Sequence, residues 1–440
     1  MGDLTGLLPT ESKTVEKIYE QYKIKGDSET ARGYLGASII GHNCERYLWY
    51  NFRFCCKPEF SGRMYRLFDT GDHEEERLVA DLRSIGCEVH DKDENGLQFE
   101  IKDIGGHFSG HMDGCALGIP EAPKTWHVLE FKTHNNKSLT KLKKEGVRKA
   151  KPMHFGQMQA YMGHTGMKRA LYLAVNKDTD ELYSERVEFD KEYFDLLMQK
   201  AERVIKATEA PPRISNRPDW YECQYCDAKE ICHNGENSEL PVIPIAELNC
   251  RQCCHATPIM EGDARWVCEK HTRGLSVEDQ RRACGDHLCL PSLIGFAEPT
   301  GSGANWIEFT TKSGVKFWHG NGKNLLSTKE LTIIPASSIA SKAVVDAKQL
   351  FGAEITEARK GIFCRYPRSD SRIVWEGKKE FLKAAWAAKY HVKIEDETIV
   401  DTETGMNVVA TEYLRDRVTI VWTDPQGTAE YDAEIREGIS

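Results

Sequence analysis

The spacing of the cysteines constrains the fold of this chain more than any other feature. The segment C-Q-Y-C-D-A-K-E-I-C holds Cys223, Cys226 and Cys232 close together however the chain folds. The first residues lack a basic stretch followed by an apolar core, so we expect a cytoplasmic protein, in which cysteines at such spacings bind metal more often than they form disulfides. Three thiolates need a fourth, and Cys44 is the best candidate. Four thiolates suit an iron-sulfur cluster or Zn²⁺ equally well.

A second group of cysteines and histidines lies between residues 250 and 289. A C-x2-C pair followed by further cysteines and histidines is typical of a zinc ribbon. The preferred ligand set is Cys250, Cys253, Cys268 and Cys284, with His271 and His287 as alternatives. The segment has too little apolar content to fold unaided, which favours a structural Zn²⁺. Such a module would position DNA or a partner protein.

The length of 440 residues predicts two to three domains. Composition shifts and Pro/Gly-rich stretches divide the chain into residues 1–238, a Cys/His-rich module at 239–295 and an α+β accessory domain of unknown role at 296–440. Within the first domain, a helix ending at Gly86, strands at 107–116 and 125–133, a helix around 154–164 and a strand near 168–177 form an α/β pattern. No apolar run is long enough to span a bilayer, so we expect no membrane segment.

Three charged residues on neighbouring strands predict a metal site. Asp113 follows the first strand, and Glu130 and Lys132 alternate along the next as E-F-K, so these two side chains share one face. Two carboxylates can hold Mg²⁺ or Mn²⁺, while the ammonium group orients water or offsets charge on a phosphate. Taken alone, so short a motif also arises by chance on exposed strands.

Flanking residues strengthen the metal-site interpretation. We expect Glu75 to lie in the first turns of a helix, where another acid could reach the same metal ions. Gln157 and Tyr161 lie one helical turn apart and could flank a bound strand, although such pairs are usually just half-buried surface. The basic run after the E-F-K strand suits contacts to a DNA backbone, although most charge runs are solvated faces. Its DNA-binding candidates are Lys141, Lys143, Lys144, Arg148 and Lys149.

The order G…E, GxxD, ExK and QxxxY over residues 35–235 resembles the PD-(D/E)XK exonucleases, including RecB-like and CRISPR-associated members. The resemblance implies a mixed sheet flanked by helices and a Mg²⁺- or Mn²⁺-dependent exonuclease that hydrolyses DNA from single-stranded or duplex ends. It further implies a role in phage DNA recombination, repair or replication, with a homo-oligomer or a recombination protein as partner. Many RecB-like members carry histidine in the first motif. Here Glu75 keeps the spacing, and His73 is the alternative.

The resemblance also selects the metal at the first cysteine group. One cysteine before an aromatic helix and a C-x2-C-x5-C segment after the core match the iron-sulfur RecB-like nucleases, which implies a 4Fe-4S cluster at Cys44, Cys223, Cys226 and Cys232. The cluster would staple the two ends of the domain. The competing hypothesis is a catalytically idle DNA-binding or assembly module held by the same metals.

Overall fold

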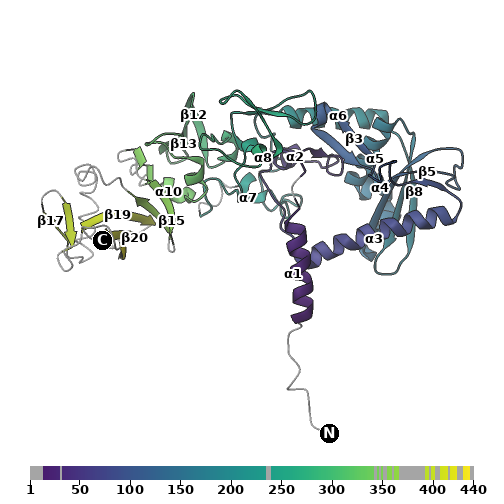
Figure 1. The fold of residues 1–440 in the computed structure, drawn as a ribbon, viewed down its shortest axis with the longest axis horizontal. Helices are drawn as coiled ribbons and strands as arrows, with labels where there is room; N and C mark the ends of the chain where they lie inside the picture. The colour runs from purple at the N-terminus through teal and green to yellow at the C-terminus, as the bar shows by residue number, and fades with distance from the viewer. Residues whose placement is uncertain are drawn as a thin grey trace, which may run out of the picture. The chain divides into compact units, whose positions relative to one another are not determined.

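The structure, a computed structural model, describes residues 13–29, 32–233 and 239–340, and beyond them residues 344–345, 348–349, 354–358 and 361–365 and strands β17 to β21. The chain divides into two units (Figure 1). The first contains Met1–Ala207, Pro211–Ile214 and Pro258–Val267, and the second contains the remainder. In the part of the chain that the structure describes, no helix is both long and apolar enough to cross a membrane.

A five-stranded mixed sheet forms the centre of the first unit. Its order is β2 (Glu88–His90), β5 (Cys115–Leu117), β6 (His127–His134), β7 (Arg169–Asn176) and β8 (Leu182–Glu188). Strands β6 and β7 are parallel and the other neighbours are antiparallel. The parallel register sets Glu130 beside Tyr172. The predicted α/β fold with a mixed sheet is confirmed.

Helix α3 (Gly62–Ser84) covers one face of this sheet. Leu78 and Leu82 pack in one apolar cluster with Phe131 and Leu171, which alternate with the polar residues of β6 and β7. The helix begins at Gly62 because the Ser61 hydroxyl accepts the Met64 N–H at 3.3 Å. The expectation that Glu75 lies in the first turns is therefore wrong, since the capped start of the helix lies more than three turns upstream.

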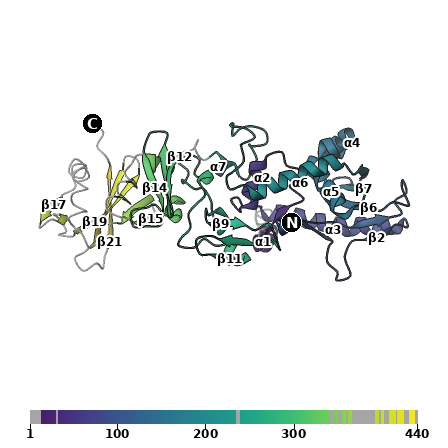
Figure 2. The same ribbon diagram turned by 90° about the horizontal axis from the view of Figure 1, so that it is seen from above.

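Helices α4 (Asn136–Ala150) and α5 (Pro152–Thr165) lie on the other side of β6 and β7 from α3 (Figure 2). Asn135 caps α4 by accepting the Ser138 N–H at 2.8 Å, so the basic run is helical. Pro152 suits the first position of α5, where a missing N–H costs nothing. Helix α6 (Lys191–Lys206) packs on α5, α2 (Glu45–Phe52) begins after Cys44, and α1 (Lys13–Asp27) packs along α3.

A small second sheet leads the chain to Asp113. Its order is β1 (Leu35–Gly36), β4 (Phe108–His111) and β3 (Glu100–Asp103), with the 3-10 turn Ile104–Gly106 between β3 and β4. The expected single strand over 107–116 is two strands, because β4 and β5 belong to different sheets. Gly114 makes the change of direction: its φ is 138°, and a Cβ there would lie 2.5 Å from the His90 carbonyl oxygen.

One segment of the Cys/His-rich sequence, residues 258–267, folds with the first unit. Trp266 is 1% exposed and packs against Phe52 and His107, with ring centroids 5.5 and 6.1 Å away. His107 Nε2–H donates to the Ile259 carbonyl at 2.9 Å. The backbones of the two segments are also in contact, because the Ala264 N–H donates to the carbonyl at position 105 at 2.7 Å. The buried core of this unit thus includes residues that are distant in sequence.

The second unit consists of short helices and small antiparallel sheets. Strands β13 (Trp306–Thr311) and β14 (Lys316–Gly320) form a hairpin, with β12 (Ala297–Gly303) beside β13. The remaining short elements between residues 229 and 340 are α7 (Lys229–Cys232), η3 (Cys250–Gln252), β9 (Ala256–Pro258), β10 (Trp266–Cys268), β11 (Arg273–Leu275), α8 (Val277–Gln280), η4 (Pro291–Leu293), α9 (Thr328–Leu331) and α10 (Ala336–Ala340). A further sheet contains β15 (Glu354–Ala358), β16 (Gly361–Arg365), β17 (Val392–Glu395), β18 (Thr398–Asp401), β19 (Asn407–Leu414), β20 (Arg417–Thr423) and β21 (Glu430–Arg436).

Candidate active site

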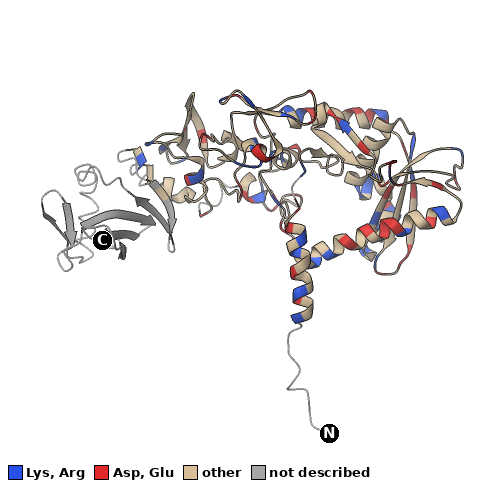
Figure 3. Cartoon of the chain, viewed as in Figure 1, with Lys and Arg blue, Asp and Glu red and all other residues tan. Residues whose placement is uncertain are grey.

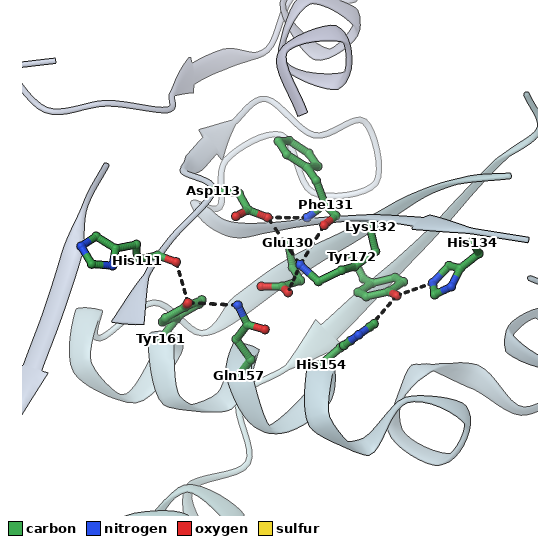
Figure 4. Close-up of polar contacts among 10 residues, drawn as sticks. All are labelled: His111, Asp113, Glu130, Phe131, Lys132, His134, His154, Gln157, Tyr161 and Tyr172. Carbon is green, nitrogen blue, oxygen red and sulfur yellow. Dashed lines mark hydrogen bonds and ion pairs between the residues drawn. The ribbon is translucent and has the colours of Figure 1, made fainter. Parts of the chain in front are cut away.

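Asp113, Glu130 and Lys132 come together in the first unit (Figure 4). Asp113 lies between β4 and β5, and Glu130 and Lys132 lie on β6. Lys132 Nζ lies 2.6 Å from Glu130 Oε1 and 4.0 Å from Asp113 Oδ2. The same ammonium group donates to the Phe131 carbonyl at 2.8 Å. Asp113 Oδ2 accepts the Phe131 N–H at 2.7 Å. The strand alternation inferred from E-F-K therefore produces one compact site that contains two carboxylates and one cation.

Burial and like charges raise the pKa values of the carboxyl groups. Burial raises the pKa of Glu130 to about 8, opposed by Lys132 and reinforced by Asp113 and Glu75. Burial also raises the pKa of Asp113 against the opposing effects of Lys132 and the Phe131 N–H. Burial lowers the pKa of Lys132, but the charges of Glu130 and Asp113 outweigh it and the pKa is raised. The Lys132 ammonium group therefore stays charged, and its single positive charge does not offset the effect of burial on the pKa values of Asp113 and Glu130.

Glu75, rather than His73, belongs to this charge cluster. Burial raises the pKa of Glu75 to about 7, and the next largest effects come from Asp113 and Lys132. His73 points elsewhere on the helix: its side chain is 75% exposed, and its Nε2 lies 3.5 Å from Asp69 Oδ2. Two residues along a helix turn through about 200°, so only one of the two can face the sheet. The geometry favours Glu75 as the first-motif residue.

Gln157 and Tyr161 hold strand β4 in place. They lie on the same face of α5, as the sequence predicts, and Gln157 Nε2–H donates to the Tyr161 hydroxyl at 3.0 Å. The hydroxyl donates to the His111 carbonyl at 2.6 Å, two residues before Asp113. Both side chains are buried, with Tyr161 only 1% exposed. Their burial favours positioning of β4 over the expected direct contact with a DNA strand.

A hydrogen-bonded group that the sequence reasoning missed lies beside the carboxylates. The Tyr172 hydroxyl lies 2.8 Å from His134 Nε2 and 2.9 Å from His154 Nδ1 (Figure 4). Tyr172 projects from β7, His134 ends β6 and His154 begins α5. Glu130, Lys132 and His134 are spaced two residues apart on β6 and so share one face. This spacing is a sequence signal that could have placed His134 near the site. Tyr172 joins them only through the parallel register, which local sequence does not reveal.

The carboxylates fit a divalent metal ion by one structural test. Both oxygens of Glu130 are fully buried; Oε1 contacts the Lys132 ammonium group at 2.6 Å, and Oε2 receives no hydrogen bond from the described residues. A buried carboxylate in that state requires more positive charge. Among the described residues, no group of three or more His, Cys, Asp or Glu side chains is arranged to hold a metal ion. Mg²⁺ needs only one or two protein carboxylates, however, and completes its shell with water and phosphate oxygens.

The basic run lies along α4, and part of its charge is already paired. Lys143 Nζ lies 2.5 Å from Glu181 Oε1, and Arg148 Nη2 lies 3.1 Å from Asp190 Oδ2. Lys141 makes only a longer contact, 3.9 Å from Glu145 within the helix. Blue Lys and Arg residues mark α4 in Figure 3, in contrast to the mixed charges along α3. DNA binding by the basic run stays a prediction: all five candidates are exposed, and among the described residues Lys144 and Lys149 make no ion pair.

The cysteines of the first group come from two segments of the chain, one before α2 and one that ends with α7. Cys44 precedes α2 in extended backbone, and its N–H donates to His42 Nδ1 at 3.0 Å. Cys223 and Cys226 lie in successive turns, linked by the Cys226 N–H to the Cys223 carbonyl at 3.2 Å. Cys232 ends the one-turn helix α7. The iron-sulfur cluster stays a prediction.

The thiols of the second cysteine group act on one another electrostatically, although among the described residues no group of three or more His, Cys, Asp or Glu side chains is arranged to hold a metal ion. Burial raises the pKa of Cys250 to about 12, and the next causes are the thiols of Cys253, Cys284 and Cys268, so the predicted set influences itself electrostatically. Cys253 Sγ accepts the Leu288 N–H at 3.4 Å, and such N–H···S bonds stabilise thiolates around metals.

The two histidine alternatives for the second group differ in what their rings contact. His287 is not available to a metal ion, because its ring nitrogens lie 2.9 Å from Thr328 Oγ1 and 2.9 Å from the Asn249 carbonyl. His271 remains an alternative, with Nε2 4.0 Å from Cys284 Sγ. The zinc site itself stays a prediction.

Comparison with known proteins finds a matching family model and distant structural similarities. Residues 58–233 match the family model described as the PD-(D/E)XK nuclease superfamily. No curated protein matches the chain. Distant structural similarity exists to SSO0001, with 16% identity, a TM-score of 0.33 and coverage of 50% of this chain and 96% of that one. For the alkaline exonuclease LHK-Exo from Laribacter hongkongensis the identity is 17% and the TM-score 0.27, with coverage of 42% of this chain and 90% of that one. For LHK-Exo in complex with dAMP the identity is 16% and the TM-score 0.28, with coverage of 43% of this chain and 90% of that one.

Proposed function

We propose, from the premise that residues 58–233 form a domain of the PD-(D/E)XK nuclease superfamily, that the chain is a metal-dependent nuclease that hydrolyses phosphodiester bonds of DNA. The observation that carries the proposal is the fully buried Glu130 carboxyl group, which lies beside Asp113 and Lys132 and whose Oε2 receives no hydrogen bond from the described residues. A purely structural ion pair would satisfy both oxygens. A catalytically idle module has no use for this arrangement.

Each residue of the site has a chemical task in this proposal. Asp113 and Glu130 would hold Mg²⁺ or Mn²⁺, and Glu75, whose charge acts on Glu130, would add negative charge to the site. A bound ion of this kind supplies Lewis-acid polarisation of the phosphate and lowers the pKa of a bound water. Lys132, fixed by Glu130 and the Phe131 carbonyl, orients the attacking water and offsets charge that develops on the phosphate. Gln157 and Tyr161 set the position of the strand that ends at Asp113.

We further propose that the enzyme acts from DNA ends, as an exonuclease in recombination, repair or replication. The notion rests on the order of the four motifs rather than on an observed cleft. Single-stranded and duplex ends both remain candidate substrates, and phage origin and assembly with a second copy or a recombination protein remain part of the same hypothesis. A linear substrate and a closed circle of the same sequence separate this hypothesis from an endonuclease.

The decisive experiment measures Mn²⁺-dependent digestion of end-labelled linear and circular DNA. Wild type should digest the linear DNA and spare the circle, while Glu130→Gln and Lys132→Met should digest neither. The matched control is Glu188→Gln, which removes an exposed carboxylate paired with Arg169 outside the site and away from the basic run, and should leave the rate unchanged. Full activity in Glu130→Gln would refute the catalytic assignment, and rapid cutting of the circle would refute the exonuclease assignment.

We also propose two structural metals. A 4Fe-4S cluster at Cys44, Cys223, Cys226 and Cys232 would join the ends of the nuclease domain. A Zn²⁺ ion at Cys250, Cys253, Cys268 and Cys284 is supported by the mutual electrostatic influence of these thiols and by the N–H···S bond to Cys253. Neither metal has a task in the hydrolysis.

A further inference from the structure

The polar chain beside the carboxylates ends at a ring nitrogen that no described residue contacts. Tyr172 is fully buried, and its hydroxyl contacts His134 Nε2 at 2.8 Å and His154 Nδ1 at 2.9 Å. His134 Nδ1 lies 3.1 Å from Ser138 Oγ, which extends the chain to α4. His154 is half-buried, and its contact with Tyr172 uses Nδ1 only. Its orientation is therefore fixed while Nε2 remains available to a ligand.

The groups around His154 are basic. Burial lowers the pKa of His154 to about 3, and the next causes are Lys132, Lys151 and His134. Burial lowers the pKa of His134 to about 4, together with Lys151, Lys132 and Lys177. Both imidazoles are therefore neutral at physiological pH. The acidic groups that act on the chain, Glu130 and Glu185, do so at the Tyr172 hydroxyl, whose pKa they and burial raise.

Lys151 is the cation at this place that lacks an acidic partner among the described residues. It is half-buried between the end of α4 and the start of α5, three residues before His154. Burial and the charge of Lys141 lower its pKa, and no carboxylate counteracts them. Lys132 differs, since Glu130 lies 2.6 Å from it. A partly desolvated ammonium group without a counterion requires an anion.

We propose that Lys151 and His154 form a phosphate subsite next to the carboxylates, one that binds a DNA phosphate other than the one cleaved. The proposal rests on the proposed nuclease function and names a substrate contact within it. Lys151 supplies charge and His154 Nε2–H supplies a neutral hydrogen bond. Tyr172 and His134 are positioning residues that hold the imidazole.

The geometry of the hydrogen-bonded chain permits a direction in which His154 donates to an anionic ligand. The Tyr172 hydroxyl has one proton, so it donates to one histidine and accepts from the other. When Ser138 donates to His134 Nδ1, His134 Nε2–H donates to Tyr172 and Tyr172 donates to His154 Nδ1. His154 then carries its proton on Nε2, facing outward. A phosphate oxygen only accepts, so its binding selects this direction of the chain.

The experiment measures DNA affinity across a salt series with Ca²⁺ in place of Mg²⁺, to permit binding without turnover. Lys151→Ala should weaken binding and reduce the slope of log affinity against log salt by about 0.7 to 0.9, the value for one lost phosphate contact. His154→Leu should weaken binding about fivefold, the typical effect of one neutral hydrogen bond, without changing the slope. His154→Gln, which keeps an N–H donor, should recover part of the loss.

Two tyrosine variants separate positioning from general damage to the fold. Tyr172→Phe should weaken binding about twofold to threefold because the imidazole loses its anchor. Tyr183→Phe is the matched control, since its hydroxyl donates to Glu185 Oε2 at 2.7 Å on the neighbouring strand and has no contact with the histidines. Its affinity should equal that of wild type. Circular dichroism checks that each variant is folded, and the half-exposed Lys151 and the Gln variant keep the test informative if His154→Leu misfolds.

Wild-type affinity and slope in both Lys151→Ala and His154→Gln would overturn the subsite. Duplexes with a 5′-phosphate and a 5′-hydroxyl identify the phosphate: an effect confined to the former indicates the terminal phosphate, and equal effects indicate the backbone. The nuclease proposal fails separately. If wild type cleaves no DNA while Lys151→Ala still lowers the slope, the subsite stands and the catalytic proposal falls.

Discussion

Glu130 shows how one buried residue determines the charge balance of the site. Its carboxyl group is enclosed on every side, yet its neighbours are two further acids and a single lysine. In the folded chain it therefore holds a proton up to a pH of about 8, and Glu75 does so up to about 7. In the unfolded chain both titrate near 4.5. Folded and unfolded chains thus bind different numbers of protons across this interval.

That difference predicts how metal binding and stability depend on pH. Between about pH 5 and pH 8 the folded, metal-free protein binds more protons than the unfolded chain, so its stability should fall as the pH rises. Mn²⁺ replaces those protons, and its stabilising effect should therefore be larger at pH 8 than at pH 5. Thermal unfolding with and without Mn²⁺ at both values measures this effect.

Glu130→Gln is the control for the pH dependence, because it removes the titrating group but keeps the size of the side chain. Its unfolding temperature should vary less with pH, and Mn²⁺ should raise it less. An equal Mn²⁺ effect at pH 5 and pH 8 in the wild type would contradict the prediction.

Residue patterns anticipated the chemistry of the site better than its supports. The alternation of Glu130 and Lys132 on one strand is a local property, so the sequence alone predicted their shared face. The chain from His134 through Tyr172 to His154 depends on the parallel register of β6 and β7 and on the packing of α5. These pairings join residues far apart in sequence, and no local pattern encodes them.

At the scale of elements, helix capping explains both a success and an error. The helix with Gln157 and Tyr161 was predicted correctly because it is short and bounded by Pro152 and Gly166, which has a φ of 76°. Helix α3 was predicted to begin too late because the Ser61 cap was not recognised. A capping serine is a weaker sequence signal than an apolar period.

Helix α4 gives a prediction about which basic residues bind DNA. Lys144 and Lys149 have no ion-pair partner among the described residues, whereas Lys143 and Arg148 contact Glu181 and Asp190. Replacing Lys144 and Lys149 with alanine should weaken DNA binding and lower its salt slope by about 0.7 to 0.9 per residue. The double alanine variant of Lys143 and Arg148 should lower the slope less. Equal changes in the two variants would show that the ion pairs do not limit DNA contact.

At the scale of the whole molecule, the order of the sequence does not match the order of the packing. Residues 258–267 come after residues 58–233, which carry the carboxylate site, and lie within the Cys/His-rich segment, yet they pack in the first unit around Trp266. Gly105 allows this approach, because a Cβ there would lie 2.4 Å from the Met260 carbonyl oxygen. Composition suggested a boundary near residue 238, and it could not reveal that a later segment returns to complete the core.

Trp266 should therefore stabilise the first unit. Trp266→Ala removes a side chain that is 1% exposed and should cost about 3 to 5 kcal/mol of unfolding free energy. Trp220→Ala is the matched control, because Trp220 is 39% exposed and its loss should cost less than about 1 kcal/mol. Urea unfolding of the full chain measures both. Similar small losses would show that residues 258–267 contribute little to the stability of the first unit.

The last prediction concerns the two structural metals, which should be lost independently because their proposed ligands are different cysteines. Cys232→Ser should remove iron and leave zinc, and Cys250→Ser should remove zinc and leave iron. Metal-ligand free energy contributes to folding, so each variant should also unfold at a lower temperature than wild type. Glu130→Gln should keep both metals and lose only Mn²⁺-dependent hydrolysis. Anaerobic purification, elemental analysis, thermal unfolding and the DNA assay on all three variants distinguish these effects. Loss of both metals from either cysteine variant would mean that the two groups form one site, and full iron in Cys232→Ser would refute the cluster.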